Sequence, residues 1–136
     1  MTEIRSPILA RSIHKLFQIY WYIFRPDSYG VKIILKSANN KFLLVRLTYF
    51  PNTWTFPGGG VSKGEDAFSS MQRELREEVG IIIGKQNLSL IGSLEFNHEY
   101  KKDTVQIFAG VSEEIKPAID GKEVAEARWF LKGEFP

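Results

Sequence analysis

Apolar residues recur at steps of three and four through the first part of the chain, a spacing typical of an amphipathic helix. Pro7 lies near the start of this pattern and Pro26 ends it. We therefore predict a helix within residues 1–26 that packs on the core of a domain formed by residues 27–136. A self-association surface or docking on a membrane surface are the alternatives. The apolar positions are Leu9, Ile13, Leu16, Phe17, Tyr20 and Phe24.

Beyond residue 27 the pattern changes to short apolar runs separated by turn residues, which indicates strands. The stretch 37–40, Ser-Ala-Asn-Asn, lies between the first two runs and predicts a hairpin turn. The order of elements is helix, strands, helix, strands, which favours an α/β fold with a mixed sheet and helices packed on it. The predicted strands are 31–35, 42–46, 53–56, 88–95, 104–111 and 125–130.

Residues 66–79 give the clearest helical pattern. Phe68, Met71, Leu75 and Val79 share one face, and Gly80 supplies a C-terminal stop. We expect this face to pack on the sheet.

Composition limits the remaining choices. At 136 residues the chain fits one domain, and because it contains no cysteine it has neither disulfides nor a thiolate metal site. A net charge of +2 gives no reason to expect a stable nucleic-acid partner. No apolar run approaches the roughly 20 residues that span a bilayer. We expect a cytoplasmic protein without a transmembrane segment.

Three acids crowd the end of the second predicted helix. With Glu74 at 0°, Glu78 lies at about 40° and Glu77 at about −60°, since each residue turns by about 100°. Like charges four residues apart repel, and the negative end of the helix dipole disfavours anions. Arg73 offsets part of this through a pair with Glu77. A divalent cation with oxygen ligands, Mg²⁺ or Mn²⁺, would stabilise the cluster, whereas a solvated acidic face is the alternative.

Glycines precede the helix at Gly58, Gly59, Gly60 and Gly64. Glycine permits positive φ and lets the backbone approach a ligand closely. We predict a turn that leads into the helix and approaches a bound substrate.

Together these residues resemble the Nudix box, G-x5-E-x7-R-E-U-x-E-E-x-G-U, which the chain matches at every defined position from Gly59 to Ile81. The lead-in 55–60 and the late strand 127–130 also resemble the family. The resemblance implies an α/β/α sandwich with a mixed sheet. It implies metal ligation by Glu74, Glu77, Glu78, Glu65 and the Gly59 carbonyl. The resemblance also implies catalytic roles for Glu77, Glu74 and Arg73, and substrate contacts at Gly58, Gly59 and Gly60.

The implied reaction is metal-dependent hydrolysis of the diphosphate bond in a nucleoside diphosphate-linked substrate. We place Arg46 among the substrate contacts, and Trp54 or Tyr49 as a surface for a base, with core packing as the alternative. His98 is either a surface residue or a substrate contact. The general base in this family sometimes lies outside the box; the candidates here are Glu99, Asp103, Glu123 and Glu126.

Rival hypotheses remain within this resemblance. The substrate could be capped RNA, a dinucleoside polyphosphate, a nucleotide sugar or an oxidised nucleoside triphosphate. Diphosphate isomerases share the box but use a cysteine, which this chain lacks. A non-catalytic nucleotide-binding regulatory domain is the third rival. The family's C-terminal helix is short or missing here, so we predict that the N-terminal helix covers the free sheet face; otherwise the patch favours a homodimer.

Overall fold

The computed structural model describes residues 28–98 and 101–136. The predicted N-terminal helix and the candidate base Glu99 lie outside these residues, and nothing is described for the side chain of His98.

The described residues form one mixed sheet, as predicted. Its main path runs β3-β2-β1-β6-β5, with β4 paired to β1 and β7 paired to β2. Strands β1 and β6 run parallel and the other pairs are antiparallel. The strands are β1 Ser28–Lys36, β2 Lys41–Leu47, β3 Trp54–Thr55, β4 Gly58–Gly60, β5 Leu88–His98, β6 Lys101–Val111 and β7 Val124–Leu131.

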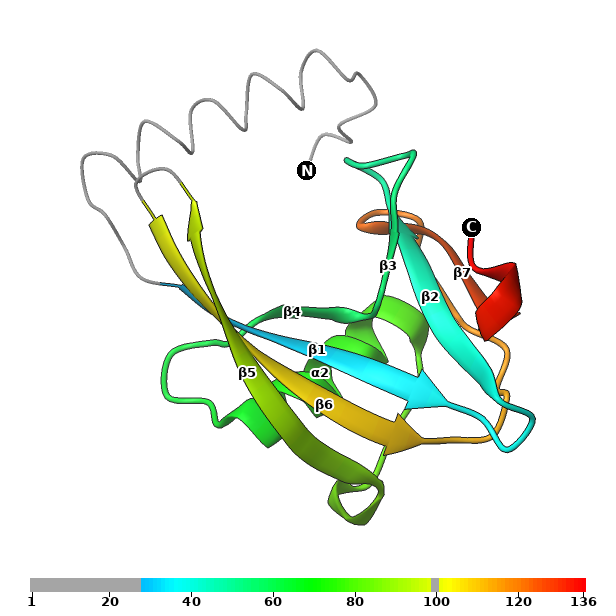
Figure 1. Cartoon of the computed structure of the whole chain (residues 1–136), viewed down its shortest axis with the longest axis horizontal. Coiled ribbons are helices and arrows are strands. Elements are labelled where there is room, and N and C mark those ends of the chain that lie inside the picture. Colours follow the sequence, from blue (N-terminus) through cyan, green and yellow to red (C-terminus); the bar gives the residue numbers. More distant parts are fainter. Residues whose placement is uncertain (1–27, 99–100) are drawn as a thin grey trace.

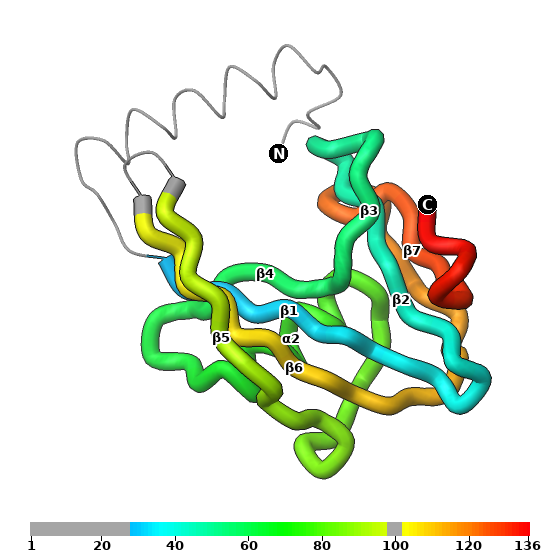
Figure 2. Tube along the Cα trace, viewed as in Figure 1, coloured from blue at the N-terminus to red at the C-terminus, as the bar shows by residue number. Residues whose placement is uncertain are grey.

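The sheet divides into two halves that diverge from one hairpin. Strands β1 and β2 share a single registered pair, Lys36 opposite Phe42, beside the turn where Asn40 adopts a φ of 59°. Beyond that point β1 continues beside β6 and β4, whereas β2 continues between β7 and β3. Figures 1 and 2 show the two halves separating above this turn. The short link between β3 and β4 joins the two halves of the sheet.

Helix α2, Ala67–Val79, begins and ends as its sequence predicts. Asp66 caps the first turn by accepting a hydrogen bond from the Ser69 N–H at 2.9 Å. Gly80 ends the helix in the left-handed region at a φ of 70°, and its N–H donates to the Arg76 carbonyl at 3.0 Å. These two caps fix which residues occupy the last two turns.

The core lies between α2 and one face of the sheet. Met71, Leu75 and Val79 are fully buried in one cluster with apolar residues of the sheet, among them Ile33 and Leu43. Phe68 packs edge to face on Phe108 of β6, with ring centroids 5.1 Å apart. The predicted apolar face of α2 is confirmed, and this packing fixes the helix relative to β4.

The predicted α/β fold with a mixed sheet is confirmed, but the described residues place an α-helix on one face of the sheet only. Residues 28–98 and 101–136 supply one α-helix, α2, together with the short 3₁₀ turns η1, Lys85–Asn87, and η2, Lys132–Glu134. Strand β7 is followed directly by η2. Within the described part of the chain, no helix has the length and apolar character needed to cross a bilayer.

Candidate metal and phosphate site

Arg73 ties together three of the acids singled out in the sequence. Its Nε lies 3.0 Å from Glu65 Oε2, and its Nη1 lies 2.9 Å from Glu74 Oε1 and 3.1 Å from Glu77 Oε2. Its Nη2 donates to the Gly60 carbonyl at 2.9 Å. A planar guanidinium can serve several acceptors at fixed angles. Arg73 therefore connects the acidic side of α2 to the glycine strand.

Glu78 faces inward at the edge of the core. Glu78 is only 6% exposed, and its Oε1 accepts a hydrogen bond from the Gly58 N–H at 2.7 Å. Burial raises the pKa of Glu78 to about 7, although the Gly58 hydrogen bond and nearby Lys32 act in the opposite direction. The site thus holds a buried carboxyl with too little positive charge around it.

Glu74 lies against the glycine strand. A side-chain carbon at Gly59 would come within 2.6 Å of Glu74 Oε1, so the carboxylate occupies the space that any other residue at position 59 would need. Burial, opposed by Arg73, raises the pKa of Glu74. Glu77 is more open, with a side chain 53% exposed. Glu74, Glu77 and Glu78 therefore lie close together on α2 but differ in burial.

Three of the glycines form a strand, and the turn that we predicted between the glycines and the helix follows at residues 63–64. Gly58–Gly60 is β4, paired antiparallel with Gly30, Val31 and Lys32 of β1. Of the predicted four, only Gly64 has a positive φ, at 80°. Close packing explains Gly58 and Gly59 instead: an added carbon at Gly58 would collide with the backbone of β1. Glycine is needed at Gly58 because β4 lies close to the backbone of β1, and at Gly59 because β4 lies close to the carboxylate of Glu74.

Glu65 supports Arg73 from the loop before α2. It accepts hydrogen bonds from Ser70 Oγ at 2.5 Å and from Arg73, and these bonds lower the pKa of Glu65 to about 2. Ser70 is fully buried and was missed in the sequence because a serine within a helix carries no distinctive signal. Glu65 therefore remains ionised at the pH at which Glu78 titrates.

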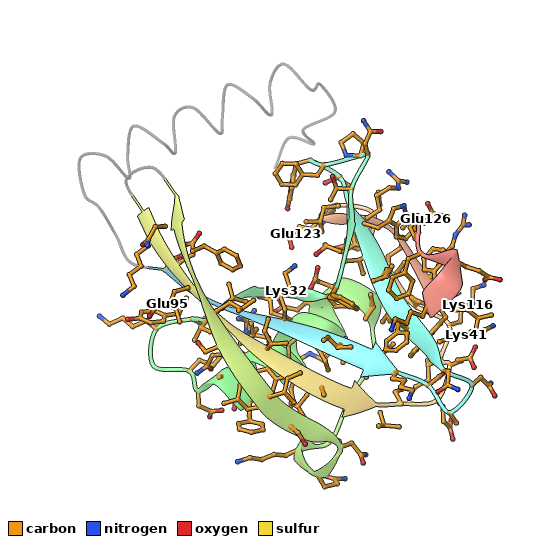
Figure 3. All side chains as sticks on the ribbon, in the orientation of Figure 1. Lys32, Lys41, Glu95, Lys116, Glu123 and Glu126 are labelled. Carbon is orange, nitrogen blue, oxygen red and sulfur yellow. The ribbon has the colours of Figure 1, made fainter. Side chains whose placement is uncertain are left out.

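Lys32 is the second residue that the sequence did not single out. Its Nζ donates to the Phe56 carbonyl at 3.0 Å, and it interacts electrostatically with Glu78 and Glu74. Burial lowers its pKa. The available signal was a lysine inside the apolar run 31–35. Figure 3 labels Lys32 in the middle of the view, between the two halves of the sheet.

Arg46 and Trp54, two of the residues that we predicted near the substrate, lie on the other half of the sheet. Arg46, on β2, pairs with Glu126 of β7 at 3.4 Å. Trp54 stands opposite Arg46 in the register and packs edge to face on Phe130, with centroids 5.2 Å apart. Trp54 therefore has a packing role. Burial raises the pKa of Tyr49, and the negative charges of Glu123 and Glu78 raise it further. The Tyr49 hydroxyl therefore lies within electrostatic reach of these two acids.

Glu123 is the candidate base that the fold brings to the box. It interacts electrostatically with Glu74 and Glu78 from the start of β7 (Figure 3). Glu126 is paired with Arg46 and Arg128. Asp103 lies on β6 and accepts a hydrogen bond from Ser28 Oγ at the start of β1.

The donor set fits a hard divalent cation. Glu74, Glu77 and Glu78 supply carboxylate oxygens, the ligands that Mg²⁺ takes in small number while retaining water. The buried Glu78 would gain the positive charge that it lacks. Within residues 28–98 and 101–136, however, no three ligating side chains already converge on one point, because Arg73 holds Glu74 and Glu77.

Comparison with known proteins identifies the family of the domain. The NUDIX domain model matches residues 27–135. The chain is 30% identical over 117 residues to the RNA pyrophosphohydrolase of Pelagibacter ubique (strain HTCC1062), covering 74% of each chain. It is 40% identical over 70 residues to the m7GpppN-mRNA hydrolase NUDT17 of Xenopus laevis, covering 48% of this chain and 24% of that protein. It thus spans about a quarter of the latter's length.

Solved structures show the same fold. The MutT NUDIX hydrolase from Burkholderia pseudomallei aligns with a TM-score of 0.70 at 18% identity, covering 82% of this chain and 88% of that one. The MutT/nudix family protein from Enterococcus faecalis aligns with a TM-score of 0.69 at 22% identity, covering 85% of this chain and 50% of that one. With a complete box, the matching domain and the shared fold, the chain belongs to the Nudix family.

Proposed function

We propose that this chain hydrolyses the pyrophosphate bond of a nucleoside diphosphate-linked substrate with the help of Mg²⁺, or Mn²⁺ in its place. The observation that carries the proposal is the arrangement at the end of α2. Arg73 gathers Glu65, Glu74 and Glu77 beside the glycine strand, and Glu78 is buried there without a full countercharge. The names of the relatives, RNA pyrophosphohydrolase and 8-oxo-dGTP diphosphatase, support the same reaction class.

The residues divide the work according to their positions. Glu74, Glu77 and Glu78 would hold the cation, with Glu65 and the Gly59 carbonyl as further ligands. When bound, the cation neutralises phosphate charge and lowers the pKa of water. Arg73 would hold the acids beside β4 through its pairs with them and through its bond to the Gly60 carbonyl.

The chemical step places a water oxygen on phosphorus and breaks the bridging phosphorus–oxygen bond. The water proton passes to a carboxylate, for which we assign Glu77, and the released phosphate departs with the bridging oxygen. Glu123 is the alternative acceptor outside the box, since it lies near Glu74 and Glu78. The backbone of Gly58, Gly59 and Gly60 can approach the phosphates because no side chain intervenes, and Arg46 would contact the substrate from β2.

The expected cellular setting is the cytoplasm, with no stable nucleic-acid partner. The absence of cysteine and the small net charge support both expectations.

A substrate screen tests the proposal. Purified protein is incubated with nucleotide sugars, dinucleoside polyphosphates, nucleoside triphosphates and 5′-triphosphorylated or capped RNA, with Mg²⁺ or with EDTA. Glu74→Gln tests the site, and Glu95→Gln, on the exposed part of β5, is the matched control. We expect Mg²⁺-dependent release of a phosphate-containing product that Glu74→Gln loses and Glu95→Gln retains. Absence of metal-dependent turnover on every diphosphate would refute the proposal.

A further inference from the structure

The side chain of Lys32 lies across the glycine strand. Its neighbours Val31 and Ile33 are buried in the cluster that contains Leu75 of α2, so Lys32 projects from the opposite face of the sheet. The register pairs Lys32 with Gly58, and directly opposite residues of antiparallel strands project from the same face. A carbon added at Gly58 would come within 2.9 Å of Lys32 Cδ. The lysine therefore occupies the space that a side chain at position 58 would fill.

The ammonium group of Lys32 reaches the link between β3 and β4. Its Nζ donates to the Phe56 carbonyl at 3.0 Å and to Thr55 Oγ1 at 3.4 Å. An ammonium group carries three N–H donors and no acceptor. The two bonds to the link therefore leave one donor of Lys32 for a further acceptor.

Arg73 also lies beside the acids of α2, but its donors are already used. Its Nε–H is shared between the two carboxylate oxygens of Glu65. The Nη1 group donates to Glu74 and Glu77, and the Nη2 group donates to the Gly60 carbonyl and again to Glu65. A guanidinium has five N–H donors. All five therefore have acceptors among the described residues.

A diphosphate that lies along β4 needs a positive charge besides that of the bound cation, because the cation also neutralises the acids of α2. Lys32 interacts electrostatically with Glu78 and Glu74, so its charge acts in the same region. A lysine ammonium is a compact charge that binds phosphate oxygens well. Lys32 therefore offers a donor and a charge beside the glycine backbone that can approach the phosphates.

We infer that Lys32 binds a phosphate oxygen of the substrate beside β4, next to the cation held by the acids of α2. The inference rests on the proposed function, since it requires a diphosphate along Gly58–Gly60. It gives the two cationic side chains different roles: Arg73 holds the acids, and Lys32 holds the substrate. Loss of the Lys32 charge should therefore weaken phosphate binding without weakening metal binding.

Calorimetric titration of methylenediphosphonate, a diphosphate analogue whose carbon bridge resists hydrolysis, tests the inference. Binding is measured with saturating Mn²⁺ in the unsubstituted protein, in Lys32→Met and in Lys36→Met, which changes the exposed lysine at the end of the same strand. We expect Lys32→Met to bind the analogue at least about tenfold more weakly, because a hydrogen bond between charged groups is lost. Lys36→Met should bind it like the unsubstituted protein. Mn²⁺ alone should bind Lys32→Met at least as tightly as the unsubstituted protein.

Three results would overturn the inference. Equal affinity for the analogue in all three proteins would show that Lys32 does not hold the phosphate. Loss of Mn²⁺ binding together with analogue binding in Lys32→Met would show that the lysine supports the acids instead. Absence of analogue binding in the unsubstituted protein would also overturn it, whereas metal-dependent turnover in the substrate screen decides the proposed function separately.

Acetylation of lysines gives an independent measurement on the unsubstituted protein, which applies even if Lys32→Met fails to fold. The reaction is followed by peptide mass spectrometry in Mn²⁺, with and without methylenediphosphonate. A phosphate bound to the ammonium should slow the modification of Lys32 several-fold and leave that of Lys36 unchanged. An unchanged rate at Lys32 would contradict the inference.

Discussion

The carboxylate of Glu74 occupies the space beside Gly59 that any larger residue would need. An added carbon at Gly59 would meet all three terminal atoms of Glu74, whereas the same atom at Gly60 would meet nothing within 4 Å. The Glu74 carboxylate thus restricts position 59 to glycine, whereas no neighbouring atom restricts position 60, although the sequence shows glycine at both. The contrast supplies a matched pair of variants.

Gly59→Ala should displace Glu74 and weaken Mn²⁺ binding by about tenfold, the scale found when support of a metal ligand is lost. Gly60→Ala should bind Mn²⁺ like the unsubstituted protein. Titration followed by electron paramagnetic resonance measures both affinities, and thermal unfolding checks that both variants fold. Equal affinity in the two variants would show that Glu74 does not depend on Gly59.

Arg73→Gln should lower kcat by about 10- to 100-fold with a smaller effect on KM, because the arginine positions acids without holding the cation. Arg76→Gln, on the exposed side of the same helix, is the control and should leave kcat unchanged. Steady-state kinetics on the substrate found in the screen separates the two constants. If both variants lost activity equally, the loss would reflect general damage to α2.

Glu78→Gln should stabilise the metal-free protein at pH 8. Burial raises the pKa of Glu78 from 4.5 to about 7, so folding favours its protonated form, and this contribution is lost as the pH rises through 7. A shift of this size corresponds to about 3 kcal/mol at most. Glutamine keeps an oxygen for the Gly58 N–H and carries no charge. Unfolding in EDTA should show a higher Tm for the variant at pH 8 and a much smaller difference at pH 5.

The same variant should lose metal binding, so that stability and function change in opposite directions. A Tm unchanged or lowered at pH 8 in EDTA would show that the charge of Glu78 is already compensated.

Lys32→Met should increase the rise in Tm that Mn²⁺ produces. Lys32 is the buried cation that faces Glu74 and Glu78, so its removal leaves more negative charge for the metal to neutralise. Lys36→Met, at the exposed end of the same strand, is the matched control. Differential scanning fluorimetry with and without Mn²⁺ measures the shift. A smaller metal-induced rise in Lys32→Met than in Lys36→Met would mean that Lys32 assists metal binding.

The sequence predicts the helix of this site well because its signals are local. Asp66 and Gly80 act within one turn of α2, and the spacing of its apolar residues determines which side turns toward the sheet. The pairing of Arg73 with Glu77 follows from the same helical geometry.

Relations between distant elements were harder to predict. The turn between the glycines and the helix could be predicted, and Gly64 adopts a positive φ there, but the sequence does not show that Gly58 and Gly59 serve close packing against β1 and α2. Lys32 was overlooked because its partners come from β3, β4 and α2, which only the folded chain brings together. The nearness of Glu123 to the box likewise depends on β7 pairing with β2.

The central claim is that the acids at the end of α2 form a divalent-cation site. Isothermal titration of Mn²⁺ into the unsubstituted protein, Glu77→Gln and the control Glu95→Gln tests it directly. Because Glu77 is largely exposed, its substitution should leave the fold intact. We expect binding at least about tenfold weaker in Glu77→Gln than in the other two proteins. Indistinguishable Mn²⁺ binding in all three proteins would contradict the account.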